Sequence, residues 1–337
     1  MTLDLPLVFA GIMGLAMLLY VVLDGYDLGV GMLVPAATPE EQNRMVNSIG
    51  PFWDANETWL VLGIGVLLVA FPAAHGLVLT ALYLPVVVML IGLMLRGAAF
   101  EFRIKALGWH RELWNWLFWL GSFLASFAQG FMLGRYITGF ESGFGFFLFA
   151  TVVGAGLCGG YVLLGATWLI LRTENELQKK SIVWARWGLA WTFLGIGLVS
   201  LGTPLVAESV REKWFGFPLI FVLMLLPVAT LASGIALWRS CGKLARGEPA
   251  SELAPFVYAA LIFVLAFAGL AYSLFPYVVI EKMTIWDAAA HRSALTIVFY
   301  GAAVVVPLIA AYTAFSYRVF RGKAQESLYE DAGATKT

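Results

Sequence analysis

The sequence predicts an all-α polytopic membrane protein of about nine transmembrane helices. Of its 337 residues, 61% are hydrophobic and 12% are charged, whereas about 25% are charged in an average soluble domain. Charged side chains solvate a surface, so a chain this poor in them cannot cover a water-facing globule. Its apolar runs are continuous rather than alternating, and only helices or closed barrels satisfy every backbone polar group in lipid. We therefore expect these runs to be helices.

Nine apolar stretches are long enough to cross a membrane. A helix needs about 20 residues to span the roughly 30 Å hydrocarbon core. The stretches cover residues 6–24, 57–74, 77–95, 114–133, 144–171, 187–206, 216–238, 254–275 and 294–317. Because the connections between them are short, we expect a single transmembrane domain over residues 1–320 and a polar C-terminal tail over 321–337.

The basic residues predict the orientation of the chain in the membrane. With the N-terminus outside, 16 of the 21 Lys and Arg residues fall in the inner connections and the C-terminal region. Basic residues accumulate on the cytoplasmic side of membrane proteins. We therefore expect a periplasmic N-terminus and a cytoplasmic C-terminal tail. The formal net charge of zero gives no electrostatic reason to expect a nucleic-acid partner.

We expect neither a dinucleotide site nor a haem held by this chain. Residues 154–159 (GAGLCG) fit the pattern G-x-G-x-x-G, but a dinucleotide site needs that pattern in a turn between a strand and a helix. Here it lies inside an apolar run, where glycines let helices pack closely. The three histidines, His75, His110 and His291, all fall in or next to loops. The sequence also lacks a C-x-x-C-H motif for covalent haem attachment.

Carboxylates at membrane depth are the most informative polar residues. Asp24 and Asp27 lie at the end of the first stretch, and Asp54 and Glu57 begin the second. A spacing of three places each pair on one helical face. In the predicted topology, both segments share the cytoplasmic boundary with the end of the third stretch. That end carries Arg96, Glu101 and Arg103.

Spacing alone leaves the role of these residues open. Acids inside a membrane are costly and often form proton relays, ion sites or buried pairs. In a purely structural alternative, Asp54 and Glu57 form a capping box at the start of a helix. Asp24 then does no more than pair with Arg96. Gln129, inside the fourth stretch, is expected to hold helices together rather than to bind a ligand.

Three segments resemble the hallmark blocks of a known family. They cover residues 24–31 (DGYDLGVG), 53–59 (WDANETW) and 96–103 (RGAAFEFR). In this order they are similar to subunit II of bacterial cytochrome bd-type quinol oxidases, and in particular to the cyanide-insensitive branch. Ala55 stands where glycine is expected and Tyr26 where phenylalanine is common. Neither difference removes a titratable group.

The resemblance implies a fold, a location and partners. It implies two four-helix bundles plus one peripheral helix, paired with a similar subunit I as a heterodimer in the bacterial cytoplasmic (inner) membrane. In this family subunit I holds the haems, of b and d type or b type only, and oxidises ubiquinol or menaquinol. This chain then binds no metal or cofactor and is not catalytic alone. Small single-helix accessory subunits, membrane lipids and quinone are further expected partners.

The resemblance also gives the acids a role. The family reduces oxygen to water with protons drawn from the cytoplasm, so we expect Asp24 and Asp54 to relay protons toward subunit I. Asp27 and Glu57 are expected to tune that relay electrostatically. The supporting residues are Trp53, Asn56, Arg96, Glu101 and Arg103.

Two other functions remain open from the sequence. One is a secondary transporter that uses the acids as a cation- or proton-coupling site. Such transporters usually show inverted repeats and broken helices near the middle of the membrane, whereas these acids cluster at one boundary. The other is a subunit that only stabilises its haem-bearing partner.

Overall fold

The fold is almost entirely helical. A computed structural model describes residues 3–206, 208–217 and 220–324. In this part of the chain the only strands are β1 (Tyr277–Val279) and β2 (Met283–Thr284), which pair antiparallel. The predicted tail lies outside the described residues except for its first four, 321–324.

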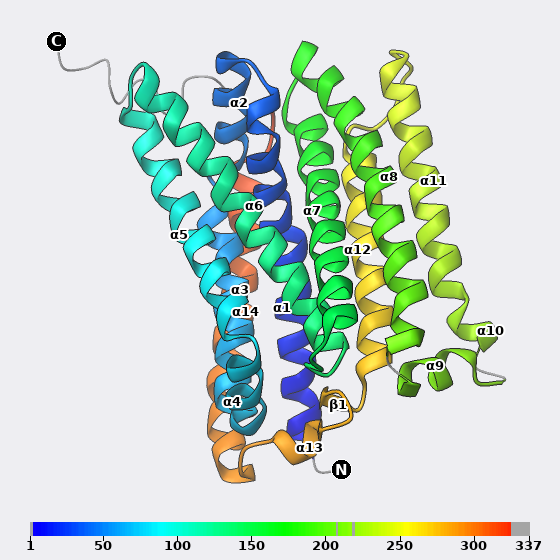
Figure 1. Cartoon of the computed structure of the whole chain (residues 1–337). Coiled ribbons are helices and arrows are strands. Elements are labelled where there is room, and N and C mark those ends of the chain that lie inside the picture. The colour runs from blue at the N-terminus through cyan, green and yellow to red at the C-terminus, as the bar shows by residue number, and fades with distance from the viewer. Residues whose placement is uncertain (1–2, 207, 218–219, 325–337) are drawn as a thin grey trace.

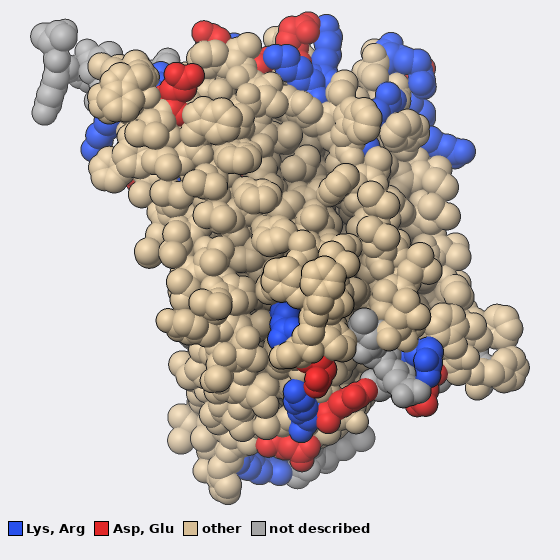
Figure 2. Space-filling view, in the orientation of Figure 1, with Lys and Arg blue, Asp and Glu red and all other residues tan. Residues whose placement is uncertain are grey.

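Nine helical spans of the described chain are long and apolar enough to cross a membrane, which confirms the predicted fold class. The helices that form them are α1 (Leu5–Leu33), α3 (Trp53–Ala70), α5 (Tyr83–Lys105), α6 (Trp109–Ile137), α7 (Phe144–Arg172), α8 (Asn175–Val206), α11 (Leu225–Ala245), α12 (Leu253–Leu274) and α14 (Arg292–Val319). The shorter helices are η1 (Val34–Ala36), α2 (Pro39–Ile49), α4 (Pro72–Ala81), α9 (Glu208–Phe215), α10 (Ile220–Leu223) and α13 (Ile285–Ala288). Figure 2 shows charged side chains mainly at the two ends of the molecule, with a broad uncharged belt between them.

The spanning helices form two four-helix bundles and one peripheral helix (Figure 1). In the first bundle α1 packs against α3 and α6, and α5 packs against α6. In the second, α7 packs against α8 and α12, and α11 packs against the same two helices. The peripheral helix, α14, packs against α3. α1 and α14 run in the same direction (Figure 1), so the described chain starts and ends on opposite sides of the bundle. Which side faces the cytoplasm stays a prediction.

The two bundles meet through bare backbone. Gly29 on α1 lies so close to α7 that a Cβ atom there would be 1.8 Å from the carbonyl oxygen of Tyr161. On the facing helix, a Cβ atom on Gly165 would be 2.4 Å from the backbone nitrogen of Val30. Glycine permits this contact because it places no side chain between two helices. We call this contact between α1 and α7 the glycine seam.

Several helix boundaries differ from the predicted ones: α5 ends at Lys105 rather than near residue 95, and α8 begins at Asn175 rather than near residue 187. α1 continues to Leu33 instead of ending near residue 24, because the residues that follow Asp27 are apolar or glycine and the helix continues to satisfy its backbone. After α3, the chain breaks at Phe71 and a short helix starts at Pro72. Proline lacks a backbone N–H and disfavours helical geometry in the residue before it. The third span therefore starts at Tyr83 rather than near residue 77.

The polar connection between α1 and α3 is fixed by a capping box and an ion pair. Thr38 and Glu41 exchange side-chain and backbone hydrogen bonds at the start of α2. Nζ of Lys180 on α8 lies 2.7 Å from Oε2 of Glu41. Burial raises the pKa of Glu41, but the hydrogen bonds from Lys180 and Thr38 outweigh it and hold that pKa below its usual value.

Removing this ion pair should give a small, pH-dependent loss of stability. Glu41→Gln is expected to lower the free energy of unfolding by about 1 kcal/mol or less at neutral pH, because solvent screens such pairs and Lys180 is 40% exposed. The folded-state pKa of Glu41 is depressed, so the pair stabilises the fold above the usual glutamate pKa of about 4.3. That contribution disappears as the pH falls through the folded-state pKa. Thermal unfolding of the two proteins should therefore converge in acid; an unchanged difference would assign the loss to packing.

Candidate functional site

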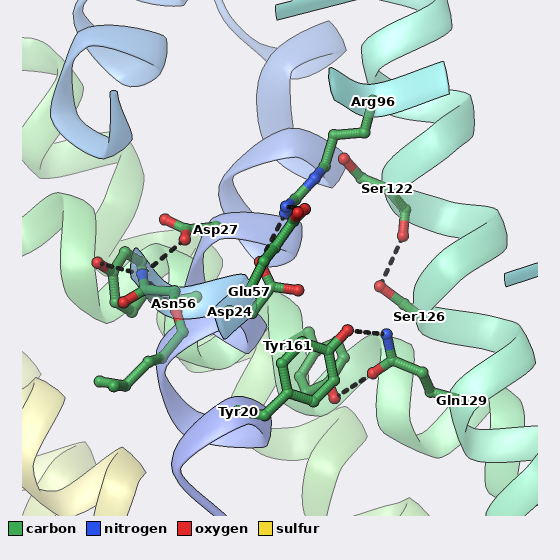
Figure 3. A network of polar contacts seen from close by, with 12 residues as sticks. Tyr20, Asp24, Asp27, Asn56, Glu57, Arg96, Ser122, Ser126, Gln129 and Tyr161 are labelled. Carbon is green, nitrogen blue, oxygen red and sulfur yellow. Dashed lines mark hydrogen bonds and ion pairs between the residues drawn. The ribbon is translucent and has the colours of Figure 1, made fainter. Parts of the chain in front are cut away.

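A buried ion-pair cluster joins α1, α3 and α5 inside the first bundle (Figure 3). Arg96 on α5 is 2% exposed, and its Nη1 atom donates to Oδ1 of the fully buried Asp24 at 2.9 Å. Its Nη2 atom donates to Oε1 of Glu57. The guanidinium also lies over the ring of Trp53, 5.8 Å from the centroid. One arginine therefore holds together three helices that carry predicted site residues.

Two residues of the cluster lie far from the ends of their helices. Asp24 is nine residues from the end of α1 at Leu33, and Arg96 is nine residues from the end of α5 at Lys105. At about 1.5 Å per residue, nine residues correspond to about 14 Å of helix. Both side chains are therefore well inside their helices, whereas Glu57 lies in the second turn of α3.

A second group of hydrogen bonds extends from Asp27 to the peripheral helix. Nδ2 of Asn56 donates to Oδ2 of Asp27 at 2.7 Å and to the hydroxyl of Tyr26 at 3.0 Å. The hydroxyl of Tyr317 on α14 donates to Oδ1 of Asn56 at 3.1 Å. The hydroxyl oxygens of Tyr26 and Tyr317 lie 2.7 Å apart. Tyr317 was not predicted, because no pattern near α14 reveals that it reaches a carboxylate on α1.

Each aspartate keeps one oxygen without a protein partner. Within the described part of the chain, Oδ2 of Asp24 and Oδ1 of Asp27 are buried and accept no hydrogen bond. Buried polar atoms are usually paired with protein or with ordered water. Two unpaired carboxylate oxygens among hydroxyl and amide groups can therefore accept protons or bind water.

A polar string lies beside the cluster and crosses between the bundles (Figure 3). Nε2 of Gln129 on α6 donates to the hydroxyl of Tyr20 on α1 at 2.7 Å. Oε1 of the same side chain accepts from the hydroxyl of Tyr161 on α7, also at 2.7 Å. Gln129 thus links three helices, as the sequence predicted. The two tyrosines were missed because a tyrosine in an apolar run gives no sign of its partner.

Three of the predicted residues lie outside the cluster. Asp54 is exposed and the first turn of α3 has no side-chain cap, so the capping-box alternative is wrong. Glu101 is also exposed. Arg103 is buried, but its guanidinium binds Asn43 and Asn115 instead of a carboxylate.

The histidines are far apart in the chain and do not form a group. His75 lies in α4, His110 is the second residue of α6, and His291 caps the start of α14. Among the residues that the structure describes, no group of three or more His, Cys, Asp and Glu side chains could hold a metal ion. The chemistry available at the cluster is therefore that of carboxylates, hydroxyls and one guanidinium.

Comparison with known proteins identifies the family. A family model described as cytochrome bd terminal oxidase subunit II matches residues 5–320. The chain belongs to the cytochrome bd terminal oxidase subunit II family. Because the match covers all nine spans, every residue of the cluster lies within the family region. This subunit II is a multi-pass protein of the bacterial inner membrane.

Individual relatives align with most of the length of this subunit. It is 29% identical over 353 aligned positions to cytochrome bd-I ubiquinol oxidase subunit 2 of Escherichia coli K12, covering 91% of each chain. It is 28% identical to cytochrome bd ubiquinol oxidase subunit 2 of Bacillus subtilis, covering 89% of this chain and 90% of that one. The solved bd oxidase of Geobacillus thermodenitrificans has the same fold, with a TM-score of 0.75 at 15% identity over 94% of this chain and 99% of that one. The branch of the family stays a prediction.

Proposed function

We propose that this subunit II stabilises a haem-bearing subunit I and supplies a proton-uptake pathway for the reduction of oxygen to water by quinol. The chain is a subunit of a terminal oxidase by family, and the relatives are named as second subunits of ubiquinol oxidases. The haems, of b and d type or b type only, and the site that oxidises ubiquinol or menaquinol then belong to subunit I. The observation that carries the proton pathway is the carboxylate cluster around Arg96.

The charge balance of the cluster supports this role. Asp24 and Glu57 bind one guanidinium, and Asp27 lies in the adjoining hydrogen-bond group around Asn56. Full ionisation of the three acids would therefore leave two negative charges without a partner. Uncompensated charges inside a membrane protein are costly, and acids there are typical of proton relays. A cluster with more carboxyl groups than cations can take up and release protons with little movement of its side chains.

The increasing exposure of three carboxyl groups on α1 and α3 supports a direction for proton transfer. Asp24 is fully buried, Glu57 is 30% exposed, and Asp54, one turn earlier on α3, is exposed. These three carboxyls therefore lead from the interior of the first bundle to the surface of the chain, where a partner subunit can reach Asp54. In this proposal Asp24 and Asp54 carry the protons, and Glu57 adjusts the charge between them.

The other cluster residues have supporting roles in the proposal. Arg96 fixes the separation of Asp24 and Glu57, and Trp53 packs against its guanidinium. Asn56 orients Asp27 through its amide. A purely structural subunit would use the same contacts, so only a measurement of function can separate the two roles.

The first experiment tests whether the chain works as an oxidase subunit. The tagged chain, purified gently from its own membranes, should bring with it a haem-bearing partner, visible in the reduced-minus-oxidised spectrum, and quinol-driven oxygen uptake. Separation from that partner should remove both signals. A monodisperse chain without haem bands or oxygen uptake would instead favour the transporter alternative.

The second step tests the proton pathway in the assembled, fully haem-loaded complex. Asp24→Asn should slow oxygen uptake by about 100-fold, the lower end of what a positioned proton-transfer group contributes, and should change its pH profile. Asp54→Asn should also slow oxygen uptake. Glu176→Gln, which changes an exposed carboxylate 2.8 Å from Lys179, is the control and should leave uptake unchanged. Unchanged uptake in both aspartate variants would leave the subunit with a structural role only.

A further inference from the structure

Two arginines that form no ion pair with any described residue meet where α5 and α6 contact α2 (upper left in Figure 1). Nη2 of Arg103 donates to Oδ1 of Asn43 at 2.7 Å, and Nη2 of Arg111 donates to the same oxygen at 2.5 Å. The two nitrogen atoms therefore lie no more than about 5.2 Å apart. Two like charges this close repel each other unless an anion lies nearby.

The side chains that hold the two arginines by hydrogen bonds are neutral. Nε of Arg103 donates to Oδ1 of Asn115 at 2.5 Å, and Nδ2 of Asn115 donates to Oε1 of Gln42 at 2.6 Å. Glu101 and Glu112 are close in sequence but exposed. In the described part of the chain, no ion pair involves either arginine or either of these acids. The Arg103–Arg111 pair therefore carries positive charge that the described part of the chain does not balance.

Burial makes that imbalance significant. Arg103 is only 3% exposed, and a charged side chain is rarely buried unless it is paired. Several of its donors are also unused. Nη1 of Arg103, and Nη1 and Nε of Arg111, have no acceptor among the described residues. Guanidinium groups present forked N–H donors that match phosphate oxygens, so these free donors fit a phosphate-type anion.

The exposed apolar side chains near Arg103 and Arg111 favour a lipid as the source of that anion. Apolar side chains at the same end of the α5–α6 hairpin are strongly exposed: Phe102 by 56%, Leu107 by 82% and Trp109 by 68%. Tryptophan and other apolar residues next to basic residues at the ends of spans are typical of the layer where lipid headgroups lie. Acyl chains can contact these apolar side chains while a headgroup phosphate reaches the arginines.

We propose that Arg103 and Arg111 bind the phosphate of an anionic membrane lipid. Asn43 and Asn115 hold the two guanidinium groups in place, because both amide oxygens accept from them. The bound phosphate offsets part of the positive charge of the two guanidinium groups and fastens α5 and α6 to α2. This site is separate from the Arg96 cluster, and the proposal does not depend on a proton pathway.

The test measures lipid binding to the whole oxidase complex after delipidation in detergent. Phosphatidylglycerol is titrated while the unfolding temperature is followed, for the wild type and for Arg111→Gln. Arg111 is only half-buried, so its variant should assemble. We expect it to bind phosphatidylglycerol about tenfold more weakly, as the loss of a charge-assisted hydrogen bond predicts. Lys105→Gln, an exposed change on the same hairpin outside the cluster, should bind like the wild type.

Two further ligands identify what the site recognises. Diacylglycerol has similar acyl chains without phosphate and should not distinguish Arg111→Gln from the wild type. Inorganic phosphate at the same concentrations should stabilise the complex much less than phosphatidylglycerol; equal stabilisation would overturn the lipid as the source. Equal affinity of the wild type and Arg111→Gln for phosphatidylglycerol would overturn the site itself.

Discussion

Replacing Arg96 with glutamine should lower the free energy of unfolding of this subunit by about 3–5 kcal/mol, because it leaves buried carboxylates without a cation. Asp24 is fully buried and binds Nη1 of Arg96 at 2.9 Å, and Glu57 binds the other terminal nitrogen. Glutamine cannot supply the positive charge that both carboxylates share. The unfolding temperature of the purified complex and its haem content should therefore both decrease.

Two variants make this expectation specific. Arg96→Lys keeps a positive charge but cannot contact both carboxylates with a forked group, so its stability should lie between the wild type and Arg96→Gln. Arg246→Gln breaks an exposed pair with Glu248, and its unfolding temperature should match that of the wild type. Equal losses in Arg96→Gln and Arg246→Gln would show that the buried cluster does not hold the first bundle together.

Adding one methyl group at the glycine seam should have the second large effect. In Gly29→Ala the new carbon would lie 1.8 Å from the carbonyl oxygen of Tyr161, so the two helices must separate. Overpacking of this kind lowers stability by about 1–3 kcal/mol and occasionally more. The expected result is a lower unfolding temperature and a smaller yield of assembled complex.

The same helix offers a control for this substitution. A Cβ atom on Gly11 would have no neighbour within 4 Å, so Gly11→Ala adds the same methyl group to α1 without a collision. Alanine is the better helix former, and this variant should be as stable as the wild type or slightly more so. If Gly11→Ala and Gly29→Ala unfold at the same temperature, the two bundles do not meet through bare backbone.

The sequence predicted the architecture because lipid imposes simple requirements on a chain. Continuous apolar runs predicted nine spans, and the structure contains nine in its described part. The ends of the helices were less predictable. Hydropathy indicates which residues can face lipid, but it does not indicate where a helix ends. α1 continues to Leu33 because its backbone hydrogen bonds continue past Asp24 and Asp27.

Spacing predicted only part of the candidate site. It placed Asp54 and Glu57 on one face, but residues three apart on a helix differ by about 60° around its axis. That difference leaves Asp54 exposed while Glu57 reaches Arg96. The partners Tyr317 and Tyr161 come from distant helices, and a local pattern cannot reveal contacts that depend on how helices pack.

The glycine seam also determines how this subunit can move. Proteins that work by alternating access rock one half against the other around a central site. Here the seam runs along α1, the helix that also carries Asp24 and Asp27, and backbone atoms of α1 and α7 touch at Gly29 and Gly165. A rocking motion would have to break this contact and repack the core between the halves. We therefore expect the two bundles to stay fixed relative to each other, so that the proposed proton pathway would depend on small rearrangements of side chains within a stiff frame.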